Sequence, residues 1–148
     1  MKIHKATAED EMQIIKLLGE FPPTDMVTTD YQAISATFHQ LIDNLQLGSM
    51  LVAEEEGDII GVISLSYPLA SRCGGIYACI EEFIVAEQGR GKGVGGQLLK
   101  EAIAEAQEKG CYEIQVNNPS GLGYPIYIRH GLTTTGRHLR MHLAHDAQ

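Results

Sequence analysis

The chain has 148 residues, of which 44% are hydrophobic and 20% are charged, and its formal net charge is -8 at pH 7. This length suits one domain spanning residues 1–148, and this composition excludes wholesale disorder. An acidic chain lacks the basic face that displaces counterions from nucleic acid. We therefore expect no nucleic-acid partner and favour a small cationic substrate.

Cysteine and histidine usage bounds the chemistry further. Cys73, Cys79 and Cys111 leave one cysteine unpaired in any disulfide scheme, and they lack the C-x-x-C spacing of metal sites. The six histidines are scattered without zinc-binding spacing, so no metal is expected. The N-terminus resembles no targeting peptide and no run of ~18 apolar residues occurs, so we expect a cytoplasmic protein with no membrane partner. A homodimer is left open.

Changes in the hydrophobic period divide the chain into elements. In chain order, these are a strand at 2–7, helices between 7 and 22 and between 28 and 48, a hairpin of strands at 50–55 and 59–67 with its turn at Gly57-Asp58, a strand at 76–85, a helix ending at Gly110, a strand at 112–116, a short helix at 124–129, and final strands near 132–135 and 138–143. This order predicts a mixed α+β fold, in which helices flank a sheet with one strand–loop–helix unit at its centre.

A glycine-rich segment lies between the 76–85 strand and the helix that follows. Residues 89–96 contain five glycines in eight positions, and the strand before them ends in Phe83, Ile84 and Val85. Glycines expose successive backbone N–H groups, and a helix N-terminus adds partial positive charge. The segment therefore predicts an anion site that fits a pyrophosphate, with Arg90 and Lys92 adding charge beside it.

Two other phosphate-binding loops fit this segment less well. Residues 91–96 match G-x-G-x-x-G, but that dinucleotide motif normally opens its fold and precedes a strand that ends in an acid. Here three strands come before the glycines, and the next strand ends in Asn117 and Asn118. The Lys-Ser or Lys-Thr pair of a P-loop is absent. A flexible loop without a ligand remains the alternative.

The segment Arg90-Gly91-Lys92-Gly93-Val94-Gly95 resembles the R/Q-x-x-G-x-G/A signature of the GNAT acetyltransferase superfamily. The stretches IEEFIV before the loop and QLL after it also resemble the family, as does the segment from Tyr127 to Leu132. The resemblance implies the GNAT fold, with a central, mostly antiparallel twisted sheet of about seven strands flanked by helices. It also implies acetyl-coenzyme A as cosubstrate and an amine acceptor that attacks directly in a ternary complex.

By resemblance, the loop N–H groups hold the coenzyme A pyrophosphate, and the strand end hydrogen-bonds the pantetheine arm. The implied cofactor-binding residues are Phe83, Ile84, Val85, Arg90, Gly91, Lys92, Gly93, Val94, Gly95, Gly96 and Asn118. Many relatives carry Asn seven residues before the tyrosine, where this chain has Ser120. The asparagine contact therefore depends on Asn117 or Asn118, which lie upstream.

The reaction needs a base for the amine and a proton donor for the departing thiolate. Glu81 and Glu82 lie on a strand whose side chains alternate between faces, so we expect at most one to face the acetyl group. The resemblance favours Glu81 as the base or amine-binding group, with Glu82 second; solvated strand carboxylates are the alternative. Tyr127 resembles the family tyrosine that protonates the thiolate, with core packing as the alternative and Tyr124 as the fallback.

A covalent route through Cys79 is disfavoured, because no neighbouring base is evident that would form the thiolate. The resemblance implies that residues 22–48 form the acceptor wall, where Asp25, Asp30 and Asp43 would attract a polyamine, an aminoglycoside or a peptide amine. Ordinary solvated helix charges are the alternative reading of these three acids. His138 and His142 bracket the final predicted strand, toward the substrate end. The alternative function is a catalytically silent coenzyme A-binding regulatory module.

Overall fold

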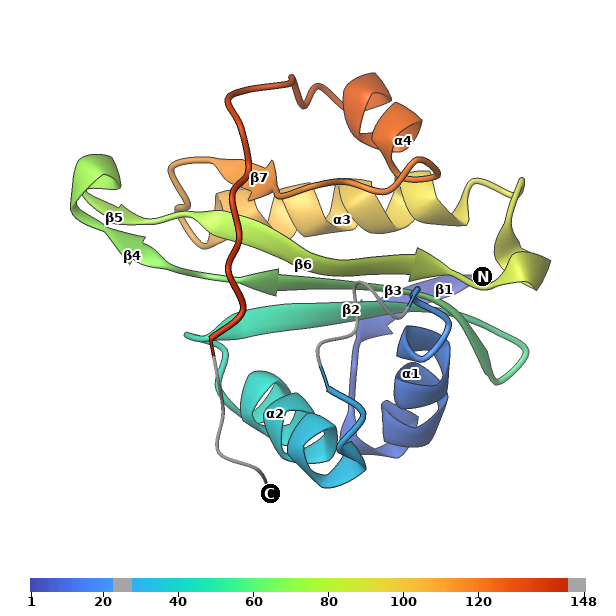
Figure 1. Ribbon diagram of the computed structural model, residues 1–148. Helices are drawn as coiled ribbons and strands as arrows, with labels where there is room; N and C mark the ends of the chain where they lie inside the picture. The colour runs from blue at the N-terminus through green and yellow to red at the C-terminus, as the bar shows by residue number, and fades with distance from the viewer. Residues whose placement is uncertain (23–27, 144–148) are drawn as a thin grey trace.

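The computed structural model describes residues 1–22 and 28–143, which build a five-stranded sheet with helices on both faces (Figure 1). The sheet order is β1-β2-β3-β6-β7. Its strands are β1 (Lys2–Lys5), β2 (Gly48–Glu55), β3 (Asp58–Ser66), β6 (Ala78–Val85) and β7 (Ile114–Val116). All neighbours are antiparallel except β6 and β7, which are parallel because α3 (Val94–Glu108) connects them. The predicted α+β fold with a mostly antiparallel sheet is confirmed.

Two hydrophobic cores lie on opposite faces of the sheet. The helices α1 (Glu11–Leu18) and α2 (Tyr31–Asp43) cover one face, and α3 covers the other, with α4 (Tyr124–Arg129) packed against it (Figure 1). The core under α1 and α2 includes Ile14, Phe38, Val52 and Val62, and the core under α3 includes Ile63, Leu65, Leu98 and Leu99. Within residues 1–22 and 28–143, no helix is long and apolar enough to cross a bilayer.

The hairpin of β2 and β3 forms the middle of the sheet. Its strands are buried over nearly their whole length, as their runs of apolar residues require. The turn is centred on Glu56 and Gly57, one residue earlier than predicted, and both residues have positive φ (51° and 86°). Two positive φ values suit a tight hairpin, because the twist of such a turn matches that of the strands.

Three short 3-10 turns and a small ribbon complete the described elements. The turns are η1 (Ala8–Asp10), η2 (Ser71–Cys73) and η3 (Glu87–Gly89), and the ribbon pairs β4 (Leu69–Ala70) with β5 (Gly75–Ile76). The ribbon was not predicted, and it separates residue 76 from the strand expected at 76–85. Seven strands are therefore present among the described residues, but five of them make the central sheet.

The two strands expected near residues 132–135 and 138–143 do not form, so that prediction is wrong. Alternation alone does not make a strand, since a strand also needs a neighbour to accept its hydrogen bonds. The segment instead runs from α4 toward α2 across the sheet strands (Figure 1). The second helix also ends earlier than expected, at Asp43 rather than near Gly48, which leaves Leu45 and Leu47 exposed.

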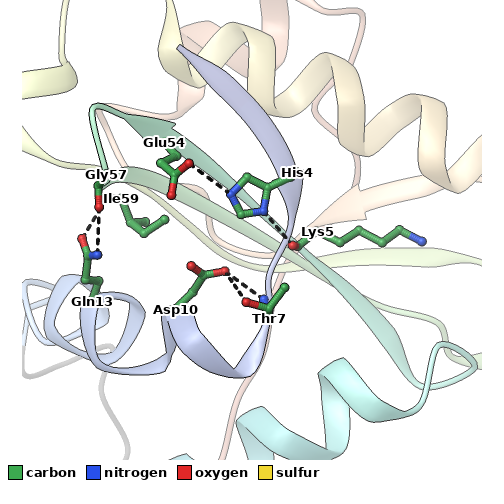
Figure 2. A network of polar contacts seen from close by, with 8 residues as sticks. All are labelled: His4, Lys5, Thr7, Asp10, Gln13, Glu54, Gly57 and Ile59. Carbon is green, nitrogen blue, oxygen red and sulfur yellow. Dashed lines mark hydrogen bonds and ion pairs between the residues drawn. The ribbon is translucent and has the colours of Figure 1, made fainter.

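A polar network fixes α1 against the sheet (Figure 2). Asp10 closes the first turn, with its Oδ2 accepting hydrogen bonds from the Thr7 N–H (2.8 Å) and hydroxyl (3.2 Å). Gln13 then reaches the β2–β3 hairpin, where its Oε1 accepts from the Ile59 N–H (2.8 Å) and its Nε2 donates to the Gly57 carbonyl (3.2 Å). These contacts set the position of the helix that borders the cavity described next.

Candidate active site

Half of β6 has a free edge. Its first residues, Ala78 to Ile80, pair with β7, whereas Glu82 to Val85 pair only with β3 and Glu81 pairs with neither strand. About 13 Å of strand edge therefore exposes backbone N–H and C=O groups. An extended ligand can bind such an edge as an additional strand does.

The glycine loop begins where this edge ends. Gly91 and Gly93 have φ values of 76° and 79°, a conformation that favours glycine, and Gly93 caps the N-terminus of α3. After the Arg90 N–H, which donates to the Glu87 carbonyl (3.2 Å), the next N–H with a carbonyl partner belongs to Gln97, which donates to Gly93 (3.1 Å). No backbone acceptor in the described parts of the chain pairs with the N–H groups from Gly91 to Gly96. Those groups and the helix N-terminus could receive an anion, and we refer to residues 91–96 as the anion cradle.

The last two glycines of the loop have a packing role. A Cβ on Gly95 would lie 3.0 Å from Ile126 Cδ1 and 3.3 Å from Phe83 Cζ, and one on Gly96 would lie 3.3 Å from His130 Cε1. Glycine at these positions lets α4 approach the start of α3. The anion cradle and the helix that carries Tyr127 are therefore built against each other.

The two basic residues of the loop contact protein groups. Arg90 donates from Nε to the Val85 carbonyl (3.2 Å), which ties the loop to the end of β6. Lys92 Nζ lies 3.7 Å from Glu55 Oε1. Both side chains are exposed, so either can also meet a ligand at the cradle.

A β-bulge brings Glu81 and Glu82 to one face of the sheet. Glu82 pairs with Ser64, but the next pair along involves Ile80, so Glu81 is an extra residue in β6. Ser64 donates a hydrogen bond to the Glu82 carboxylate, and Ser66 Oγ donates to Glu81 Oε2 (2.6 Å). Ser64 and Ser66 share one face of β3 because they are two residues apart. The expectation that the two glutamates point to opposite faces is therefore wrong.

The two carboxylates differ in burial. Glu81 is exposed, whereas Glu82 is partly enclosed between β3 and α1 and α2. Burial raises the pKa of the Glu82 carboxyl above its ordinary value; the Ser64 hydrogen bond opposes this, and the charge of Glu81 adds to it. A carboxylate with a raised pKa is the better proton acceptor near neutral pH.

Both carboxylates line a cavity of about 560 Å³. The helices α1 and α2 supply an apolar wall, including Ile15, Ile34 and Phe38, and the loop after β7 supplies Asn117, Asn118 and Ser120. Of the predicted site residues, the cavity is lined by Glu81, Glu82, Phe83, Asn118 and Tyr127. Ile84, Val85 and residues 90–96 do not line it; they lie at the other end of the free β6 edge.

Tyr127 is buried in the floor of this cavity, with its ring centroid 5.5 Å from that of Phe83. Burial raises the pKa of its hydroxyl well above the ordinary value. The Tyr127 hydroxyl oxygen has no hydrogen-bond partner among the described residues. Because no described polar side-chain atom is both buried and unpaired, this oxygen is accessible from the cavity that Tyr127 lines. The fallback residue Tyr124 is exposed, and its hydroxyl hydrogen-bonds Thr134 Oγ1 (3.0 Å) outside the cavity.

Cys79 is buried beside the same bulge. Burial, followed by the charge and hydrogen bond of Glu81, raises the pKa of its thiol to about 12. Asn117 Nδ2 lies 3.8 Å from its sulfur. A thiol with this pKa is not a thiolate at neutral pH, which agrees with the expectation that Cys79 is not a nucleophile.

The acids expected to attract the acceptor lie elsewhere. Asp30 caps α2 by accepting hydrogen bonds from the Gln32 and Ala33 N–H groups (3.0 and 3.3 Å), and Asp43 ends the same helix outside the cavity. Asp25 falls outside the described residues.

The C-terminal segment contributes His138 and Arg140 to the cavity lining, whereas His142 does not line it. Arg140 was not predicted as a site residue. The sequence signal for Arg140 is its position two residues after His138, because side chains two residues apart in an extended segment lie on the same side.

A second cluster of possible ligand atoms lies at the N-terminal network (Figure 2). His4, Asp10 and Glu54 bring donor atoms within 4.8 Å of one another. Each already has a protein contact: Asp10 caps the first turn, and His4 Nε2 lies 3.9 Å from Glu54 Oε2. None of the three lines the cavity.

Comparison with known proteins places the chain among acetyltransferases. The model of the acetyltransferase (GNAT) family matches residues 13–122.

Three relatives come from bacteria. YhfO of Bacillus subtilis, described as an uncharacterized N-acetyltransferase, is 29% identical over 135 residues, which cover 88% of this chain and 89% of that protein. The aminoalkylphosphonate N-acetyltransferase of Salmonella typhimurium is 27% identical over 132 residues, covering 88% and 83%. The S-alkylcysteine N-acetyltransferase of Bacillus subtilis is 27% identical over 96 residues, covering 64% of this chain and 54%, about half, of that relative.

Solved structures share the fold. The integron cassette protein HFX_CASS3 from the Cole Harbour salt marsh metagenome superposes with a TM-score of 0.83 at 22% identity, covering 98% of this chain and 91% of that one. An acetyltransferase from Clostridium acetobutylicum, solved with acetyl-coenzyme A, gives 0.76 at 22% identity, covering 95% of each chain. With the family model matched over most of its length, this chain belongs to the acetyltransferase (GNAT) family of enzymes.

Proposed function

We propose that this chain transfers the acetyl group of acetyl-coenzyme A to a primary amine, by direct attack of the amine in a ternary complex. One observation carries the proposal: the free β6 edge connects the anion cradle at one end to the cavity with Glu82 and Tyr127 at the other. A long ligand with phosphates at one end and a reactive group at the other fits this path.

The protein residues suit each part of that cosubstrate. The unpaired N–H groups of Gly91 to Gly96 would hold the pyrophosphate, with Arg90 and Lys92 adding positive charge. The backbone from Phe83 to Val85 would hydrogen-bond the pantetheine arm. Asn118, which lines the cavity, would contact that arm through its side chain.

Bound acetyl-coenzyme A supplies the thioester whose acetyl carbon the amine attacks. Glu82, with its raised pKa, takes one proton from the ammonium group, directly or through a water, and passes it to solvent. Glu81, on the same face and exposed, holds the cationic amine beside it. A C–N bond then forms as the C–S bond breaks.

Tyr127 stabilises the departing thiolate by hydrogen bonding and protonates it. The second proton lost by the nitrogen restores the phenol, so one proton is released per turnover overall. Burial raises the pKa of Tyr127, so its hydroxyl is protonated at neutral pH, as a proton donor must be. The raised thiol pKa of Cys79 favours this direct route over an acetyl-cysteine route.

The relatives support an amine acceptor. Their names specify aminoalkylphosphonate and S-alkylcysteine as acceptors, both small amines. The alternative function is a silent coenzyme A-binding module, which needs only the cradle and the free edge. The enclosed Glu82 and the cavity-facing Tyr127 favour the enzyme, because a binding module has no use for a base and an acid.

Two measurements test the proposal. Coenzyme A should raise the melting temperature with concentration, since a ligand present at 100 times its Kd stabilises the native state by about 2.7 kcal/mol. Thiol release from acetyl-coenzyme A should then appear with at least one member of an amine panel. No thermal shift at millimolar coenzyme A would refute the cradle assignment. A thermal shift without turnover of any amine would identify the silent module.

A further inference from the structure

The C-terminal segment, residues 132–143, crosses the sheet strands without pairing as a strand (Figure 1), and two of its residues line the cavity. Residues 133–143 are exposed, and among them Leu139, Met141 and Leu143 leave 91%, 78% and 70% of their surface to solvent. His138 and Arg140 are the two residues of the segment that line the cavity, where each remains partly open to solvent.

Arg140 has no ion-pair partner in the part of the chain that the structure describes. Each ion pair found within the described residues involves other cations, and Arg140 contacts no described carboxylate. Glu81 and Glu82 line the same cavity, and their negative charges would repel an anionic group of a ligand. The guanidinium of Arg140 would offset that repulsion. The planar donors of arginine suit bidentate binding of a carboxylate or phosphonate.

The cavity therefore has three chemically distinct parts. The glutamates on β6 suit a cationic amine, Arg140 suits an acid group, and the wall from α1 and α2 is apolar where Ile15, Ile34 and Phe38 line it. A polyamine or an aminoglycoside would leave Arg140 facing a second cation and would leave the apolar wall without a matching group.

We propose that the acceptor is a zwitterion, an amino acid with an apolar side chain, whose carboxylate binds Arg140 while its amine lies at Glu81 and Glu82. This inference rests on the proposed function and specifies its acceptor class. It replaces the purely cationic acceptor expected from the net charge. The volume of about 560 Å³ lies within the usual range for small-molecule sites, and the acceptor shares it with the acetyl end of the cosubstrate.

The test compares amines that differ only in the acid group. L-leucine, L-leucinamide and isopentylamine share the apolar side chain, and L-methionine with its amide forms a second pair. The wild-type protein should acetylate each acid with a kcat/KM about 10- to 100-fold above that of its amide, as expected for charge-assisted hydrogen bonds. Arg140→Gln should lower kcat/KM for leucine by that factor and lower the value for leucinamide far less, whereas Arg140→Lys should retain part of the preference.

Arg137→Gln provides the matched control, because Arg137 lies on the same segment and is exposed but does not line the cavity. It should leave the preference for the acid unchanged. Coenzyme A affinity should stay the same in all three variants. A loss of that affinity in Arg140→Gln would assign Arg140 to the cosubstrate and overturn the inference.

Other outcomes separate this inference from the proposed function. Turnover of isopentylamine or leucinamide at rates equal to or above leucine would overturn the zwitterion while leaving the acetyltransferase intact. The zwitterion is overturned in the same way if calorimetry shows that the coenzyme A-loaded protein binds none of the amino acids. Absence of coenzyme A binding would instead refute the proposed function itself.

Discussion

Replacing Glu82 by Gln should change activity and stability in opposite directions. The folded protein holds the Glu82 carboxyl where burial raises its pKa, so the folded state binds its proton more tightly than the unfolded chain does. The stability contributed by this group is therefore fully present below the unfolded pKa of about 4.5 and is lost as the pH rises through the folded pKa. Glutamine mimics the neutral carboxyl and carries no such loss.

The size of the effect follows from the linkage. Each tenfold increase in proton affinity produced by burial corresponds to about 1.4 kcal/mol of folding free energy above both pKa values. For a chain of this size, that energy corresponds to about 3 to 6 °C in melting temperature. Glu82→Gln should therefore unfold at a higher temperature than the wild type at pH 8, and the difference should shrink as the pH falls toward 4.5.

Thermal unfolding from pH 4.5 to 8.5 measures the stability, and thiol release across the same range measures the activity. If Glu82 is the base, kcat/KM of the variant should fall by about 10² to 10⁴ and the rising limb of the pH profile should flatten. Coenzyme A affinity should persist. Glu81→Gln is the matched control: Glu81 is exposed, so this change removes no enclosed carboxylate and should mainly raise the KM for the amine.

Two results would refute this reasoning. A Glu82→Gln protein that is less stable than the wild type by the same amount at every pH would mean that ionisation of Glu82 costs the fold nothing. A flattened limb in Glu81→Gln together with an intact limb in Glu82→Gln would make Glu81 the base.

Three further changes test other parts of the site. Tyr127→Phe keeps the ring against Phe83, so kcat should fall by about 10² or more while coenzyme A affinity is spared; an undiminished kcat would assign Tyr127 to packing. Gly95→Leu should destabilise the fold by about 1 to 3 kcal/mol and weaken the coenzyme A thermal shift, because a Cβ at this position would lie 3.0 Å from Ile126 Cδ1. Gly75→Leu is the control, since an added Cβ there has no atom within 4 Å, and it should change neither quantity. Equal thermal shifts in the two variants would contradict the packing role of Gly95. Cys79→Ala should keep kcat within about twofold, since the buried thiol is not ionised, and a loss above 100-fold would revive a covalent route.

Local sequence was sufficient for the elements whose signals are local. The glycines of residues 89–96 and the amphipathic helix after them predicted the cradle and α3, because backbone freedom and helical period depend on neighbouring residues. The apolar runs of β2 and β3 likewise predicted the central hairpin, with its turn misplaced by one residue.

Tertiary structure decided what depends on pairing between distant segments. The bulge at Glu81 is a property of the register between β3 and β6, so strand alternation alone assigned the two glutamates to opposite faces. Residues 138–143 alternate as a strand does but pair with no described strand, and they become a crossing segment instead. That crossing brings Arg140 to the same cavity as Glu82, which lies on a strand almost sixty residues earlier in the chain. Sequence spacing does not encode that two such distant residues line one cavity.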